Sequence, residues 1–109
     1  MNKEFPLLNE TNTNVDFEKY EQKFKALADQ QRLQIIHILA TKGSVCVCDL
    51  TPLIDMPQSK LSYHLKILLD AELVNKEKRG TWNYYSLNLE GVKAILSDQL
   101  CCVFLPSCS

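Results

Sequence analysis

The most constraining feature of this sequence is an apolar stripe at helical spacing between Gln58 and Ala71. Leu61, Leu65 and Leu68 recur every three or four residues, which predicts one buried face of a helix. The opposite face carries small polar, aromatic and basic side chains, namely Ser59, Ser62, Tyr63 and Lys66. A helix with this pattern must pack against other apolar elements, and its polar face is free to contact a partner.

Three more helices are predicted ahead of this stripe. A first amphipathic helix begins near Asp16. A second begins after Asp29, which can cap its N-terminus, and ends at Gly43. A short third helix covers about Asp49–Ile54, with its first residue as the cap and Pro52 accommodated in the first turn.

Two runs of β-forming residues follow, at 74–79 and 82–87, and the intervening Gly80-Thr81 is typical of a hairpin turn. A last amphipathic helix begins near Asn88 or Leu89. The predicted fold is therefore mainly α with a small β-hairpin, in the order α-α-α-α-β-β-α. This is the order of a winged helix-turn-helix domain.

A chain of 109 residues has the size of one domain. We expect a flexible N-terminal arm at 1–14, a winged helix-turn-helix domain at 15–102 and a cysteine-containing tail at 103–109. A domain this small buries only about 60 to 70% of its unfolded surface, so a second copy is a natural source of additional core. The absence of a signal-peptide pattern and of a membrane-length apolar run predicts a cytoplasmic protein without a membrane partner.

Basic residues concentrate in the middle of a chain whose net charge is −1. Side chains early in the 58–71 helix suit base edges and phosphates, and the hairpin tip suits phosphates or a minor groove. The candidate contacts to double-stranded DNA are Gln58, Ser59, Lys60, Ser62, Tyr63, His64, Lys66, Lys76, Lys78, Arg79 and Thr81. For His64, support of the helix is the alternative role. A polar helix face is usually just a solvated face, and a basic hairpin a protected sheet edge, but their succession in this order favours DNA binding.

The five cysteines form two groups, which predicts thiols with a chemical task. An odd number in a reducing compartment is a poor disulfide framework. One group is Cys46 and Cys48, and the other is Cys101, Cys102 and Cys108. Small buried hydrophobes are the alternative, although these usually occur singly. Soft trivalent centres such as As(III) and Sb(III) prefer thiolates, and three sulfurs satisfy one ion.

The spacing of Cys46 and Cys48 predicts the local backbone. In a regular helix these positions point about 200° apart, whereas in extended backbone they lie on the same side. We therefore expect 46–48 to be at least partly unwound at the start of the third helix, with Val47 turned to the core. The N-terminus of that helix is expected to favour the thiolate.

Three blocks of the sequence resemble the ArsR/SmtB family of metal-responsive repressors: FKALADQQRL at 24–33, QSKLSYHLKILLDAELV at 58–74 and RGTWNYY at 79–85. The resemblance covers about residues 17–102. It implies a homodimer joined through the first and last helices, with the 58–66 segment in the major groove and a β-wing beside it. It also implies an operator-bound apo dimer that needs no cofactor to bind DNA.

The stretch VCVCDL at 45–50 is similar to the arsenic-site motif of the family's arsenite-responsive members, with one departure. A third cysteine follows in the fullest form of the motif, where this chain has Thr51. The third sulfur comes from the tail, or the site has only two, or the tail cysteines form a site of their own. Ligation of As(III) or Sb(III) as inducer is then expected to weaken DNA affinity.

Three alternatives remain open at this point. A zinc site of four thiolates is chemically feasible, although the usual C-x2-C spacing is missing. The resemblance implies that the family's zinc and nickel sensors use histidines and carboxylates on the last helix, and residues 89–109 contain no histidine. The same thiols suit a cadmium, lead or redox sensor of the same fold. A small thiol reductase is disfavoured, because the chain has no C-x-x-C pair and no phosphate-cradling glycine loop.

Overall fold

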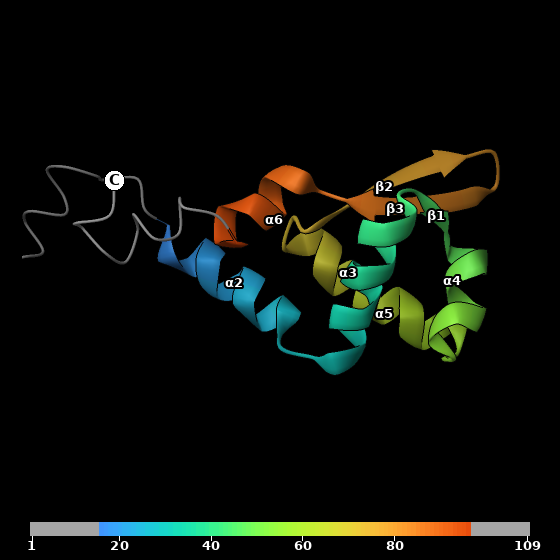
Figure 1. Cartoon of the computed structure of the whole chain (residues 1–109), viewed down its shortest axis with the longest axis horizontal. Helices are drawn as coiled ribbons and strands as arrows, with labels where there is room; N and C mark the ends of the chain where they lie inside the picture. The colour runs from blue at the N-terminus through green and yellow to red at the C-terminus, as the bar shows by residue number, and fades with distance from the viewer. Residues whose placement is uncertain (1–15, 97–109) are drawn as a thin grey trace, which may run out of the picture.

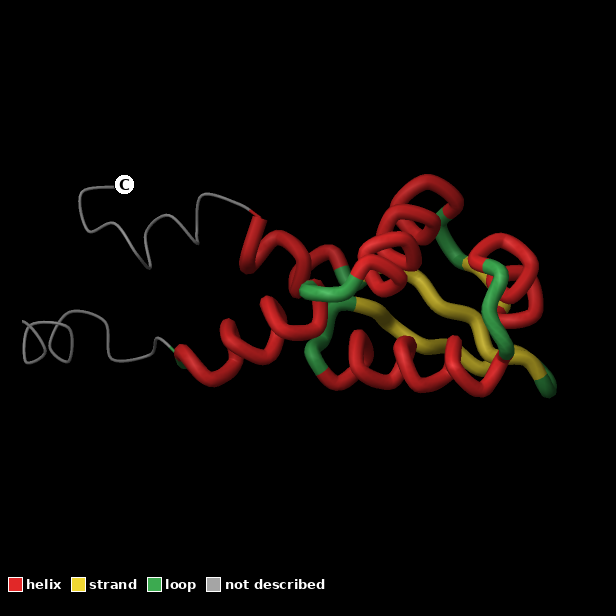
Figure 2. The backbone as a smooth tube through the Cα atoms, turned by 90° about the horizontal axis from the view of Figure 1, so that it is seen from below, coloured by secondary structure: helices red, strands yellow, loops and turns green. Residues whose placement is uncertain are grey.

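The computed structural model describes residues 16–96 as five α-helices and a three-stranded sheet within this range (Figure 1). In chain order the elements are α2 (Phe17–Leu27), α3 (Gln30–Lys42), β1 (Val45–Cys46), α4 (Val47–Ile54), α5 (Gln58–Asp70), β2 (Val74–Arg79), β3 (Trp82–Leu87) and α6 (Leu89–Leu96). In both views α2 and α6 lie at one end of the molecule, and α4 and the β2–β3 turn lie at the opposite end (Figures 1 and 2). The predicted mainly-α fold with a hairpin is confirmed.

The first two helices begin and end where their capping residues predict. The Asp16 side chain accepts a hydrogen bond from the Lys19 amide, at 3.1 Å, at the start of α2. Asp29 accepts from the amides of Gln31 and Arg32 at the start of α3, and the Arg32 hydrogen bond is the main reason that the pKa of Asp29 is lowered. Gly43 ends α3 with a φ of 86°, a conformation that costs glycine little.

The third predicted helix begins earlier than expected. It starts at Val47, its N-cap is Cys46 rather than Asp49, and Pro52 lies in its second turn rather than its first. Pro52 has no amide hydrogen, so the carbonyl of Cys48 lacks its helical donor. The strand β1 just before it was also missed, because two residues are too short to show a period.

The sheet has the strand order β1–β3–β2, and both pairings are antiparallel. The hairpin is where the sequence predicts it, with Arg79 opposite Trp82 across the two-residue turn and Gly80 at a φ of 64°. β1 adds to the other edge of β3, with Val45 opposite Tyr85 and Cys46 opposite Tyr84. β1, which leads directly into α4, and the β2–β3 hairpin therefore belong to one hydrogen-bonded sheet.

The core forms around the predicted stripe of α5. Leu61, Leu65 and Leu68 are fully buried. They share one cluster with residues of α3, α4 and the α5–β2 connection, including Ile35, Leu39, Leu50 and Leu73. Large apolar side chains on α2 and α6 remain exposed, namely Phe17, Phe24, Leu89 and Leu96. In the described range 16–96, no helix has the length and apolarity needed to cross a bilayer.

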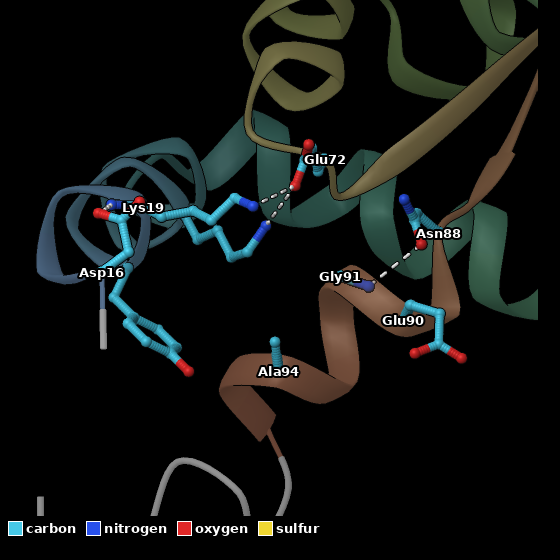
Figure 3. A pocket seen from close by; sticks show the side chains of 9 residues that line it. Asp16, Lys19, Glu72, Asn88, Glu90, Gly91 and Ala94 are labelled. Carbon is cyan, nitrogen blue, oxygen red and sulfur yellow. Dashed lines mark hydrogen bonds and ion pairs between the residues drawn. The ribbon is translucent and has the colours of Figure 1, made fainter. Parts of the chain in front are cut away.

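The C-terminal end of α5 is fixed from two sides. Lys23 of α2 is buried, and its Nζ donates to the carbonyl of Ala71 at 2.6 Å and lies 3.8 Å from Glu72 Oε1. Burial lowers the pKa of Lys23, partly offset by the Glu72 charge. α6 approaches from the other side, where the amide of Gly91 donates to Asn88 Oδ1 (Figure 3).

Gly91 leads to a first prediction, because its Cα lies against the backbone carbonyl of Glu72. A Cβ built on Gly91 overlaps that oxygen, and backbone on both sides must move to admit it. Gly91→Ala is expected to lower the free energy of unfolding by about 1–3 kcal/mol, measured by urea denaturation. An alanine at the exposed Lys93 is the matched control. Glycine-to-alanine changes inside helices usually stabilise, so a gain in stability would show that the close approach is not rigid.

Candidate nucleic-acid interface and thiol pair

The outer face of α5 presents the polar side chains that the sequence assigned to DNA. Ser59, Ser62 and Lys66 are exposed, and Tyr63 keeps 62% of its surface accessible. Pro57 precedes the helix and makes no side-chain cap, so the first amides of α5 remain available as donors. The turn between α4 and α5 has Asp55 in the left-handed region and Met56 buried in the core.

Ten of the eleven candidate DNA contacts are exposed, and His64 is the exception. Its side chain is only 4% exposed, which favours the supporting role over direct contact with DNA. Arg32 Nη1 lies 3.0 Å from His64 Nδ1, and Arg32 Nε donates to the carbonyl of Ala26 at 2.7 Å. Arg32 thus joins the end of α2 to the middle of α5. The sequence did not indicate this role, because its partner lies 32 positions away.

The environment of His64 predicts a pH dependence of stability. Burial lowers its pKa from the ordinary 6.5, and the nearby cations of Arg32 and Lys60 lower it further, against the opposing effect of Asp29. Below about pH 6.5 the unfolded chain binds a proton at His64 more readily than the folded chain does. The contribution of His64 to the free energy of unfolding is therefore fully present above about pH 6.5 and is lost as the pH falls. The expected loss is at most about 1.4 kcal/mol per pH unit from this one group.

The measurement is the free energy of unfolding between pH 7.5 and 5. His64→Asn keeps an oxygen acceptor for Arg32 but does not titrate, and it is expected to flatten the slope. His37→Asn changes an exposed histidine and is the matched control. If the slope were unchanged in His64→Asn and lost in His37→Asn, the pH dependence would arise from His37 and the assignment to His64 would be wrong.

The hairpin carries the second group of candidate DNA contacts. Lys76, Lys78, Arg79 and Thr81 are all exposed around its turn. Arg79 is held on two sides: its Nη2 lies 2.9 Å from Glu77 Oε1, and its guanidinium carbon lies 4.4 Å from the centroid of the Tyr84 ring. The hairpin therefore presents basic groups, one of them oriented, at the same end of the molecule as α4 (Figure 1).

Cys46 and Cys48 meet at the passage from β1 to α4. Cys46 is extended and buried, Cys48 is helical and exposed, and the Cys48 amide donates to Cys46 Sγ at 3.4 Å. Val47 is buried between them, as predicted. The segment is thus only partly unwound, and the Cys46 sulfur lies at the first turn of the helix that carries Cys48.

The prediction that the helix N-terminus favours the thiolate is wrong for Cys48. The pKa of this thiol is raised, first by its hydrogen bond with the Cys46 side chain and then by desolvation and the nearby charges of Cys46 and Asp49. Two adjacent sulfurs resist carrying two negative charges. A ligand that binds both must therefore displace protons as it binds.

A shallow cavity of about 410 Å³ opens beside Cys46. Its lining includes Asp49, Pro52 and Leu53 of α4 and Tyr84 of β3. Among residues 16–96, no group of three or more His, Cys, Asp or Glu side chains is arranged to hold a metal ion. The predicted tail ligands Cys101, Cys102 and Cys108 lie outside the described residues, so the structure supplies two sulfurs of the predicted set.

α4 and α5 pack on the core, α5 keeps a polar face exposed, and a basic hairpin follows. This arrangement defines a winged helix-turn-helix DNA-binding regulator. Residues 29–76 match the family profile described as "Bacterial regulatory protein, arsR family". An arsenical resistance operon repressor of Bacillus subtilis is 64% identical over 86 residues, which are 79% of this chain and 82% of that protein. The chain belongs to the ArsR family and is an ArsR-type repressor, not an enzyme.

Two further similarities agree with this assignment. A cadmium resistance regulatory protein, a CadC homolog of Staphylococcus aureus, is 37% identical over 67% of this chain and 60% of its own length. The homodimeric winged helix-turn-helix DNA-binding domain from Mycobacterium bovis superposes with a TM-score of 0.67 at 30% identity, covering 80% of this chain and 78% of that one. The first of these proteins is named for a different soft metal, and the second is named as a homodimer.

Proposed function

We propose that this repressor binds operator DNA as a homodimer and is released when As(III) or Sb(III) is bound by Cys46 and Cys48. The observation that carries the proposal is the position of the thiol pair. Both sulfurs sit at the start of α4, the first helix of the helix-turn-helix, and β1 joins them to the wing. A ligand at this point would lie where the helix-turn-helix joins the sheet of the wing.

The chemistry of the pair suits trivalent arsenic. Each thiol replaces one hydroxyl of As(OH)₃: two S–As bonds form, two As–O bonds break, and each thiol proton leaves with a hydroxide as water. Arsenic remains trivalent, so no oxidant is needed. The third position keeps its hydroxyl or takes a sulfur from Cys101, Cys102 or Cys108, which remains a prediction.

The dimer would form through α2 and α6. Their exposed Phe17, Phe24, Leu89 and Leu96 offer an apolar surface at the end of the molecule away from the hairpin turn (Figure 2). Two copies joined there would each present α5 outward, with half-sites about one helical turn apart. The reading groups would be Gln58, Ser59, Lys60, Ser62, Tyr63 and Lys66, and the wing groups Lys76, Lys78, Arg79 and Thr81.

The test measures binding of the full-length protein to its upstream promoter fragment by fluorescence anisotropy, with and without arsenite. We expect a dimer that binds without any metal and loses roughly 5- to 150-fold in affinity at saturating arsenite. Cadmium is the second candidate ligand, favoured by the similarity to the CadC homolog and by its softness. A parallel cadmium titration separates the two. An affinity that neither ion changes would contradict the proposed sensing.

A further inference from the structure

The three-stranded sheet places one thiol of the pair in the same row as the wing. Cys46 in β1 lies opposite Tyr84 in β3, and Tyr84 lies opposite Glu77 in β2. Directly opposed residues of antiparallel strands project from the same face of a sheet. The three side chains therefore form one continuous row across all three strands.

Arg79 extends this row towards the turn of the hairpin. It lies two residues beyond Glu77 on the same face, and its guanidinium contacts both neighbours, at 2.9 Å from the Glu77 carboxylate and 4.4 Å from the Tyr84 ring centroid. A cation over an aromatic face is attracted by the ring. The ring and the carboxylate together set the direction in which the guanidinium leaves the hairpin.

Tyr84 also forms a wall of the cavity beside Cys46, whose volume is about 410 Å³. Cys46 is 3% exposed, so a ligand on its sulfur has little free space and must enter from this cavity. The ligand would then press on the ring that supports Arg79. Tyr84 is the one residue of the row that touches both the cavity and the wing arginine.

We propose that Tyr84 is a positioning residue that orients Arg79 for the operator, and that a ligand held by Cys46 and Cys48 disturbs the wing through this ring. The inference rests on the proposed function and adds a route to it. α4 has its own effect on α5, so the ring is expected to carry part of the response and not all of it. Tyr84 itself does not contact DNA in this scheme.

The single tryptophan of the chain provides a local signal for the test. Trp82 lies directly opposite Arg79 and is half exposed, so its emission reports on the wing. Three properties are measured on the full-length protein: Trp82 emission during an arsenite titration, protection of Cys46 and Cys48 from alkylation by peptide mass spectrometry, and operator affinity with and without arsenite. The variants are Tyr84→Leu, which removes the ring, and Tyr84→Phe, which keeps it.

In the wild type, arsenite is expected to protect the thiols and change the Trp82 emission. Tyr84→Leu is expected to keep the thiol protection, lose the emission change and bind the operator about two- to fivefold more weakly without arsenite. Its loss of affinity on adding arsenite is expected to be smaller than in the wild type. Tyr84→Phe keeps the ring and lacks only the hydroxyl, so it is expected to retain most of the emission change and of the operator affinity. If the hydroxyl were the group that matters, Tyr84→Phe would behave like Tyr84→Leu.

The two proposals fail in different ways. Absence of thiol protection in the wild type would overturn the proposed function and this inference with it. Protected thiols together with a full emission change and a full affinity loss in Tyr84→Leu would overturn this inference alone. Should Tyr84→Leu not fold, Arg79→Gln breaks the same contact from the other side. A Trp82 response that persists in Arg79→Gln would equally overturn the route through the ring.

Discussion

Replacement of both Cys46 and Cys48 by serine is expected to leave operator binding within about twofold of the wild type and to abolish the effect of arsenite. Serine keeps the size of the side chain and an acceptor for the Cys48 amide, so the start of α4 is retained. Oxygen is a poor ligand for a soft trivalent centre, so the site is lost. The full allosteric factor, roughly 5- to 150-fold, disappears with it.

The matched control replaces Cys101, Cys102 and Cys108 by serine. If the tail lends a third sulfur, this variant is expected to respond only at higher arsenite concentration, while its maximal response persists. Anisotropy titrations of both variants on one promoter fragment provide the comparison. A full response in the Cys46/Cys48 variant, with none in the tail variant, would move the sensing site to the tail.

Replacement of Lys76, Lys78 and Arg79 by glutamine is expected to weaken operator binding about a hundredfold at 0.15 M salt. Each phosphate contact contributes a slope of about 0.9 to the dependence of log K on log salt, so three contacts contribute about 2.7. Binding isotherms at several salt concentrations measure that slope directly. The loss is expected to be similar for specific and non-specific DNA, because phosphate contacts carry little sequence information.

A matched control replaces Lys19, Lys25 and Lys93, which are exposed lysines of α2 and α6, by glutamine. It makes the same change of net charge away from the proposed DNA contacts, and sedimentation first checks that it remains a dimer, because α2 and α6 are the proposed dimer helices. If both variants lost the same slope, overall charge would explain the binding and the wing would have no special part. A slope that falls only in the hairpin variant would support contacts from the wing.

Much of the fold could be predicted from the sequence because its signals are local. Asp29 and Gly43 mark the ends of α3, and Gly80 with Thr81 marks the hairpin turn, since each acts through its own backbone or the next few residues. The stripe of Leu61, Leu65 and Leu68 identified the core face of α5 for the same reason. These features are confirmed to within one residue.

The remaining features depend on partners distant in the sequence. β1 exists because β3 offers it an edge, and a two-residue strand has no pattern of its own. Once Cys46 is fixed in that strand it caps α4, which moves the helix start to Val47. His64 shares the polar pattern of its neighbours, and only the packing of α3 against α5 reveals that Arg32 holds it inside.

The partly extended backbone at Cys46 could be predicted from the spacing of the two cysteines, whereas the acidity of Cys48 could not. A helix N-terminus by itself lowers the pKa of a thiol, and the interaction between the two thiols depends on side-chain positions that the spacing alone does not determine. Their contact reverses the direction at Cys48. The row from Cys46 to Arg79 likewise becomes visible only with the register of the sheet, which a one-residue shift would have changed entirely.

The double use of Cys46 has a consequence for the concentration at which the cell would respond. Its sulfur closes the first turn of α4 by accepting the Cys48 amide, and a capping contact of this kind is worth about 0.5–1 kcal/mol. An inducer that takes over that sulfur gives up the contact, and its apparent affinity falls by about two- to fivefold. In the proposed scheme, this backbone contact would raise the concentration of inducer needed to release the repressor.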